Sequence, residues 1–330
     1  SIHIETVTTN REIVANHLAY TFVYVFSSRS SMREIKFTTN YEPVLKFSDK
    51  DFKIKYEEHV GNDQRYLHKI DGDEKHLAVC PRCNNPVVIL GIYKHIDVSP
   101  HARHKPDLNI PGVAQYNEYK LKRCPYYVRH ADYVKEYVPE TEEPQRHELY
   151  RIAKDHFDKA IYLLQKQTGL HISYDMAEVL AENYADMRAY NYIDATVYNI
   201  PWYLLYSYCG FNLHYMIVRK GTTLFRTLKS LGFEMVDSNI KDHVCIIDHE
   251  GYVLRATDYR YSVDDDDNLN EHLLFSILKP DSNLPDVLLF NMVKRVSVKV
   301  DSSYFGNLVE YKDWKTNPKM LEIAAKYMNP

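Results

Sequence analysis

Three cysteines and one histidine in the first half of this 330-residue chain constrain its fold more than any other feature. Cys80 and Cys83 are two residues apart, the spacing of a tight turn that presents two thiolates to one ion. Cys124 offers a third thiolate, and either His101 or His104 offers an imidazole. Four such ligands suit zinc in a structural site with no open position. The sequence therefore predicts a zinc ribbon, and the alternative is an ordinary buried cysteine pair with surface histidines.

The order of residues around this motif resembles the zinc-ribbon region of competence-protein (CoiA-like) and related uncharacterised bacterial proteins. The shared pattern is Cys-x-x-Cys, an apolar strand, the run 99–104 that ends in a histidine, and Cys-Pro at 124–125. The last histidine of that motif aligns with His104, so the resemblance implies His104 as the fourth ligand and His101 as its rival. The family usually has an aromatic residue where this chain has Ala102. The resemblance covers only residues 80–126, and in such proteins a ribbon often accompanies a nuclease-like domain.

The metal motif lies in the most basic part of the chain. Residues 80–130 carry a net charge of +5, whereas residues 231–286 carry −9. Because basic side chains bind phosphates and tyrosines stack on bases, the first hypothesis is a recognition protein that binds nucleic acid here. The phosphate-binding residues would be Arg103, Lys105, Lys120, Lys122, Arg123 and Arg129. The alternative is that the ribbon only clamps a loop and its basic residues pair with acidic residues of the C-terminal half.

Two further hypotheses differ in class, so the sequence leaves open whether the protein is an enzyme. A restriction-like nuclease needs an aspartate and Glu-x-Lys on adjacent strands, where the carboxylates hold a divalent ion. Asp286, Glu310 and Lys312 fit that outline, although such spacing arises easily by chance among 45 acidic and 41 basic residues. The other hypothesis is a scaffold for protein partners, favoured by 29 tyrosines and by the charge asymmetry.

Alternating and helical patterns along the chain predict an α+β fold. The predicted segments are a β-rich N-terminal unit (1–76), a zinc-ribbon subdomain (77–138) and an α+β domain (145–330). Within the α+β domain, we expect a helical block (145–232), a β-rich region (233–315) and a terminal helix (318–328).

Local signals predict particular elements. In the N-terminal unit, short alternating runs at 34–38, 44–47 and 52–56 indicate strands. In the β-rich region, a pair of runs around residue 251 indicates a hairpin. In the helical block, an apolar face over 145–167 indicates a helix that Gly169 stops. Ser173 and Thr222 each precede a further helical pattern and are the expected caps.

The longest apolar runs, residues 18–26 and 200–209, are shorter than the roughly 20 residues that a membrane-spanning helix needs. We therefore expect no membrane segment. Five cysteines, three of them metal ligands, suit a reducing compartment better than a disulfide framework, so the predicted location is the cytoplasm. The remaining two, Cys209 and Cys245, lie in apolar runs and are expected to be buried thiols.

Overall fold

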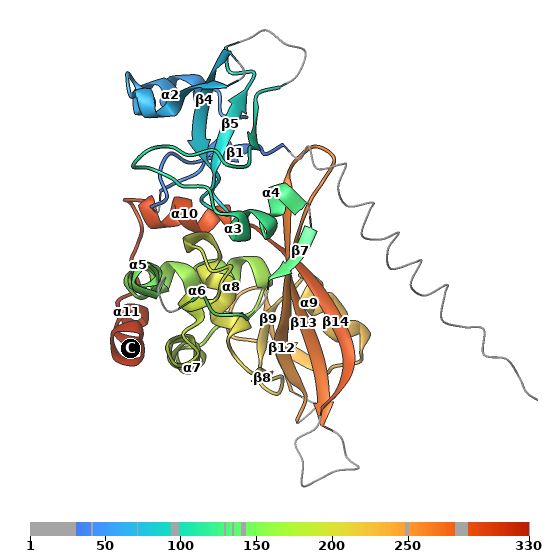
Figure 1. Cartoon of the computed structure of the whole chain (residues 1–330). Helices are drawn as coiled ribbons and strands as arrows, with labels where there is room; N and C mark the ends of the chain where they lie inside the picture. Colours follow the sequence, from blue (N-terminus) through green and yellow to red (C-terminus); the bar gives the residue numbers. More distant parts are fainter. Residues whose placement is uncertain are drawn as a thin grey trace, which may run out of the picture.

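Helices and sheets pack around two hydrophobic cores in the computed structural model, which confirms the predicted α+β class. The structure describes residues 31–40, 42–70, 72–93, 99–128, 130–133, 135–139, 143–247, 251–280 and 290–329. One core belongs to the N-terminal lobe (residues 31–128) and the larger one to the α+β domain (residues 130–329) (Figure 1). No helix in the described part of the chain is long and apolar enough to cross a membrane.

The N-terminal lobe is built on an antiparallel sheet of four strands in the order β3-β4-β5-β6. These are β3 (Leu67–Ile70), β4 (Asp73–Val79), β5 (Pro86–Leu90) and β6 (His101–His104). The lobe also contains β1 (Glu34–Ile35), β2 (Leu45–Lys46), α2 (Phe52–Val60), the 3-10 turn η1 (Gln64–Tyr66), α3 (Glu118–Lys122) and α4 (Pro125–Val128). The expected boundary at residue 76 falls inside β4, so the two predicted N-terminal segments share one sheet and one core.

One predicted strand of this lobe is wrong. Residues 52–56 belong to the helix α2, which buries Phe52, Tyr56 and Val60 against the lobe core and exposes Ile54. The short alternation of Phe52, Ile54 and Tyr56 imitates a strand, but the spacing of four residues continues to Val60 and marks one helix face. The predicted strands at 34–38 and 44–47 are found as the short paired strands β1 and β2.

The central block is mainly helical, and its caps agree with the sequence. It contains α5 (Glu143–Asp155), α6 (Phe157–Thr168), α7 (Tyr174–Asp186), η3 (Ala189–Asn191), η4 (Val197–Asn199), α8 (Ile200–Tyr206) and α9 (Thr223–Ser230). Gly169 ends α6 in the left-handed conformation (φ 79°), a conformation that favours glycine. The hydroxyls of Ser173 and Thr222 accept hydrogen bonds from the backbones of Met176 and Phe225 and cap α7 and α9. The single helix expected over 145–167 is divided at His156.

Three long antiparallel strands dominate the C-terminal part, in a sheet of order β14-β13-β12-β7 with β8 also paired to β12. The strands are β7 (His130–Tyr133), β8 (Phe211–Asn212), β12 (Val253–Val263), β13 (Leu269–Pro280) and β14 (Phe290–Val300). A smaller sheet holds β9 (Ile217–Arg219), β10 (Met235–Asp237) and β11 (His243–Ile246). The expected hairpin around residue 251 is wrong, because β11 and β12 belong to different sheets. Helices α10 (Ser303–Glu310) and α11 (Pro318–Tyr327) follow, and α11 confirms the predicted terminal helix.

The hairpin of β12 and β13 connects the two parts of the molecule (Figure 1). β12 begins within the α+β domain and β13 returns to it, and the tip between them reaches the N-terminal lobe, where Val263 is buried in the lobe core. Leu269, at the other side of the tip, packs against both cores. The hairpin is therefore a shared element of both cores and fixes where the lobe sits.

Candidate metal centre

Four side chains from three segments of the N-terminal lobe form one cluster, called here the metal cluster: Cys80, Cys83, His104 and Cys124. Cys80 and Cys83 lie in the turn between β4 and β5, His104 ends β6, and Cys124 lies between α3 and α4. The three cysteines are buried and form no disulfide. Within the described residues, this is the only group of three or more histidine, cysteine or acidic side chains placed to hold a metal ion.

The spacing of the donor atoms fits a tetrahedral zinc site. Zinc–sulfur bonds of about 2.3 Å and zinc–nitrogen bonds of about 2.0 Å put two sulfurs about 3.8 Å apart and a sulfur and nitrogen about 3.6 Å apart. The Sγ atoms of Cys80 and Cys124 are 3.7 Å apart, and His104 Nε2 lies 3.3 Å from Cys83 Sγ and 3.7 Å from Cys124 Sγ. All four donor atoms lie within 4.8 Å of one another. The cluster can hold a metal ion, as the sequence predicts.

Backbone geometry explains how the turn presents two thiolates. The Cys80 amide donates to the Asn85 carbonyl (2.9 Å), and the Asn84 amide donates to the Cys80 carbonyl (3.1 Å), which closes the turn around Cys83. Asn84 adopts the left-handed conformation (φ 58°), which asparagine tolerates better than most residues. The buried Asn85 side chain accepts a hydrogen bond from the Asn117 backbone (2.6 Å), which ties the turn to the start of α3.

The thiols influence one another strongly. Burial raises the pKa of Cys83, but hydrogen bonds from Cys124, Cys80 and Asn85 outweigh burial and hold that pKa well below its ordinary value. Burial and the hydrogen bonds with Cys80 and Cys83 raise the pKa of Cys124 well above its ordinary value. The protein alone thus favours a thiolate at Cys83 beside a protonated Cys124. A divalent cation among the sulfurs supplies the charge that lets further thiols ionise.

The two histidines of β6 have different roles. His104 directs Nε2 at the cysteines, whereas His101 lies outside the cluster and its Nδ1 is 3.0 Å from the Ser99 carbonyl oxygen. They are three positions apart, an odd step along the strand, so their side chains leave opposite faces of it. His104 is therefore the histidine of the cluster.

Arg82, between the two cysteines of the turn, enters a buried network with the α+β domain. Its guanidinium donates to the Ser302 hydroxyl (2.6 Å) and lies 3.3 Å from the Glu34 carboxylate and 3.6 Å from the Glu271 carboxylate. The Arg82 side chain is only 5% exposed, and those of Glu34 and Glu271 are 9% and 2% exposed. Glu34 belongs to the lobe, but Glu271 lies on β13, so Arg82 joins the two parts.

Hydroxyl groups complete this network. Tyr126 of α4 donates to Glu34 (2.9 Å), and Tyr259 of β12 donates to Glu271 (2.6 Å). The Ser302 backbone amide and hydroxyl also donate to Glu271. Buried carboxylates need such donors because their desolvation is otherwise unfavourable by several kcal/mol. Sequence reasoning missed the network, since Glu34 and Glu271 lie 48 and 189 positions from Arg82 with no local pattern between them.

A second arginine beside a metal ligand also binds the α+β domain. Arg123 precedes Cys124, and its guanidinium makes two hydrogen bonds to the Asp194 carboxylate (3.0 and 2.7 Å). The hydrogen bonds with Asp194 raise the pKa of Arg123. The backbone carbonyl of Arg123 accepts a hydrogen bond from Tyr261 on β12. The alternative in which basic ribbon residues pair with later acidic residues therefore holds for Arg82 and Arg123.

The residues predicted to bind phosphate are divided between these environments. Arg123 is engaged with Asp194, and Lys122 pairs with Glu118 on the surface of α3 (2.7 Å). Lys105 is exposed, Arg103 and Lys120 are half-buried, and the Arg129 side chain lies outside the described part of the chain.

The nuclease outline is not supported by the fold. Glu310 is the last residue of the helix α10, and Lys312 follows in a turn, so neither lies on the strand that this motif requires. Phe305 and Leu308, three positions apart, are both buried on one face of this helix, which is a helical period and not a strand period. Asp286 lies outside the described residues.

The two remaining cysteines also differ from expectation. Cys209 is exposed and Cys245 is half-buried, so neither is a fully buried thiol. Cys209 follows the end of α8, where the chain turns through Gly210 toward β8 and leaves the core.

Comparisons with known proteins give this chain no relative. No protein-family model matches it, and no curated protein and no solved structure is detectably similar to it. The resemblance of residues 80–126 to competence-protein ribbons therefore stays a prediction.

Proposed function

We propose that this protein is a zinc-stabilised recognition protein, in which one structural Zn²⁺ holds the N-terminal lobe in the orientation that docks it on the α+β domain. The proposal rests on two arginines that neighbour cysteines of the metal cluster in sequence and also bind the α+β domain. Arg82 lies between two metal ligands and Arg123 precedes a third, and each binds a carboxylate of the α+β domain. An ion that fixes the backbone at residues 80–83 and 124 also fixes where these two guanidinium groups point.

Zinc is the ion that the donor set favours. Three thiolates and one imidazole form a soft set with tetrahedral spacing, and the set uses all four positions of the ion. When bound, zinc supplies a cross-link between β4, β6 and the start of α4. With no position left for water or substrate, its role in this proposal is structural.

Elemental analysis and limited proteolysis of the purified protein test the proposal. We expect one zinc per chain, lost in the Cys83→Ala variant and retained in the matched Cys209→Ala control. Chelation of the wild type should accelerate proteolytic cleavage within the N-terminal lobe, because the loops between β4, β5 and β6 lose their cross-link. A protein without stoichiometric zinc, or a Cys83→Ala variant that keeps it, would contradict the proposal.

Nucleic acid is the candidate partner of this recognition protein, favoured by the surface around α3. Tyr119 is 51% exposed, Arg123 lies over its ring, and Lys120 and Lys122 follow it in sequence. An exposed ring among cations is the arrangement that stacks an unpaired base beside its phosphates. Binding of single-stranded oligonucleotides that weakens with salt, and is lost in Tyr119→Ala but not in the exposed control Tyr215→Ala, would support it. Binding that ignores salt would count against it.

A further inference from the structure

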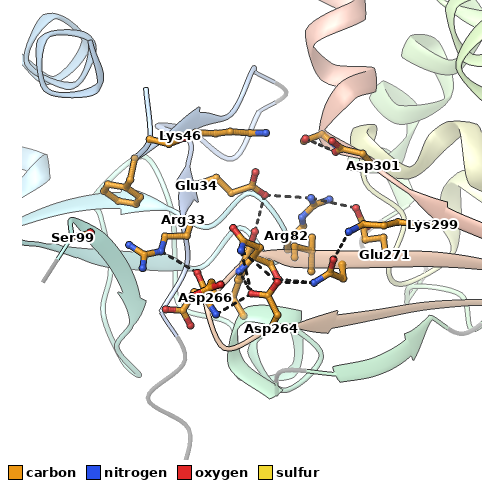
Figure 2. A pocket seen from close by; sticks show the side chains of 18 of the residues that line it. Arg33, Glu34, Lys46, Arg82, Ser99, Asp264, Asp266, Glu271, Lys299 and Asp301 are labelled. Atoms are coloured by element: carbon orange, nitrogen blue, oxygen red, sulfur yellow. Dashed lines mark hydrogen bonds and ion pairs between the residues drawn. The ribbon is translucent and has the colours of Figure 1, made fainter. Parts of the chain in front are cut away.

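A cleft of about 740 Å³ lies between the N-terminal lobe and the tip of the β12–β13 hairpin (Figure 2). The segments around β1 and β2 form one wall, and the hairpin tip with the C-terminal end of β14 forms the other. Arg82, Glu34 and Glu271 line it between the walls, so the network next to the metal cluster also shapes this cleft. The volume is within the range of small-ligand sites, about 300–1,000 Å³, and sites between two structural units are common.

The lobe wall carries positive charge that no described carboxylate neutralises. Lys46 uses its backbone amide in a hydrogen bond, and its ammonium group makes no ion pair with a described residue. Among the described residues, Arg33 donates to two backbone carbonyls, those of Asp266 and Pro100, each at 3.3 Å. In Figure 2 the Lys46 side chain extends from the lobe into the space between the walls.

The facing wall carries the opposite charge. The Asp301 carboxylate accepts hydrogen bonds from the Ser303 backbone and hydroxyl but pairs with no described cation. The Asp266 carboxylate likewise has no cation within ion-pair distance among the described residues. Lys299, on the same wall, donates to the Asn270 amide oxygen (2.6 Å). Arg33 reaches the facing wall at the Asp266 carbonyl, whereas the Lys46 ammonium on one wall and the Asp301 carboxylate on the other have no ion-pair partner among the described residues.

We propose that this cleft binds a short zwitterionic peptide, with its carboxylate toward Lys46 and its ammonium toward Asp301. A ligand with both charges satisfies both walls, whereas a ligand of one sign leaves one wall unpaired. A sphere of 740 Å³ is about 11 Å across, which matches about three extended residues at 3.3–3.6 Å each.

Triglycine and its blocked forms separate these contributions, because they differ only in terminal charge. The probes are triglycine, triglycine amide (cation only), acetyl-triglycine (anion only) and acetyl-triglycine amide (neutral), each titrated calorimetrically at low ionic strength. We expect triglycine to bind at least fivefold more tightly than either singly charged form, since one partly exposed charge pair contributes about a factor of five. Equal affinity of triglycine and triglycine amide would overturn the zwitterion assignment, and no heat from any probe would overturn the site.

Two variants assign each charge to its wall. Lys46→Gln should weaken triglycine about fivefold without affecting triglycine amide, which lacks the carboxylate. Asp301→Asn should weaken triglycine and triglycine amide without affecting acetyl-triglycine. Lys69→Gln and Asp175→Asn, exposed residues that do not line the cleft, are the matched controls. Variants that fail to discriminate the probes, or controls with the same effects, would overturn the proposal.

Zinc content of the same samples keeps this proposal distinct from the structural role of the metal. A zinc-loaded protein that binds no probe refutes the peptide site alone. A zinc-free protein that still binds triglycine with the expected charge pattern refutes the metal role alone.

Discussion

Replacement of Arg82 by methionine should destabilise the protein far more than loss of a surface arginine. The variant keeps the four metal ligands but leaves the Glu34 and Glu271 carboxylates buried without their shared cation. Breaking a buried ion pair by removal of one partner typically costs about 3–5 kcal/mol. We expect a loss in that range for Arg82→Met, with zinc content unchanged.

Arg151 is a matched control because it also pairs with two carboxylates, Glu148 and Asp155, on the surface of α5. The Arg151 side chain is 62% exposed, and pairs of this kind contribute about 0.5 kcal/mol or less. Urea unfolding followed by circular dichroism at saturating zinc gives both free-energy changes from the midpoints and slopes. A difference below about 1 kcal/mol between Arg82→Met and Arg151→Met would refute the assignment of Arg82 as a buried anchor.

A triple variant separates unpaired charge from lost packing. In Glu34→Gln/Arg82→Met/Glu271→Gln no charge of this network remains, and the hydroxyls of Tyr126 and Tyr259 still find an amide oxygen as acceptor. Replacement of a whole buried ionic network is often neutral or stabilising, so the triple variant should be more stable than Arg82→Met alone. If it is less stable, the carboxylates contribute through something other than their charge.

Three further outcomes follow from single positions. Exposed Cys209 should react with an aromatic disulfide reagent at once, whereas the buried thiols of the metal cluster should react only after chelation. Rapid reaction of the cluster thiols in the zinc-loaded protein would contradict their protection by the metal. Gly169→Ala should destabilise the protein more than Gly232→Ala. Both positions have positive φ, worth about 1–2 kcal/mol of strain, but only at Gly169 would an added Cβ meet Thr222, at 2.5 Å. Equal unfolding midpoints of the two variants would argue against the clash. Burial, and to a smaller extent the charge of His243, lowers the pKa of His171 in the folded state. Protonation therefore favours the unfolded chain as pH falls below about 6.5. His171→Asn should lose less thermal stability than the wild type between pH 7 and 5.5.

The sequence predicts those parts of the structure whose signals are local. The sequence marks correctly the helix ends at Ser173, Thr222 and Gly169, because a cap acts on backbone groups within one turn. The metal cluster was also predictable, since sulfur and imidazole ligands are few and two of them share one turn.

Pairing at long range left no such signal. Nothing near Arg82 distinguishes it from other arginines, because its partner Glu271 lies on a strand 189 positions later. The strand β11 carried an alternating pattern that fits any neighbour, so its pairing with β9 and β10 in place of β12 depended on the tertiary fold. Short runs such as residues 52–56 satisfy strand and helix periods equally, and only the burial of Val60 decided the helix.

The β12–β13 hairpin determines which contacts between the two parts of the molecule would change on loss of a bound metal. Its tip is attached to the N-terminal lobe by apolar packing of Val263, which needs no ion. Two polar attachments of the hairpin involve residues beside the metal cluster: the ion pair between Arg82 and Glu271, and the hydrogen bond that the Tyr261 hydroxyl donates to the Arg123 carbonyl. Both depend on the geometry of those segments. Release of zinc should therefore loosen the polar side of the junction, including the cleft, while the apolar tip keeps the lobe attached. On this reasoning a chelated protein stays compact in solution but loses the arrangement of charges that faces the cleft.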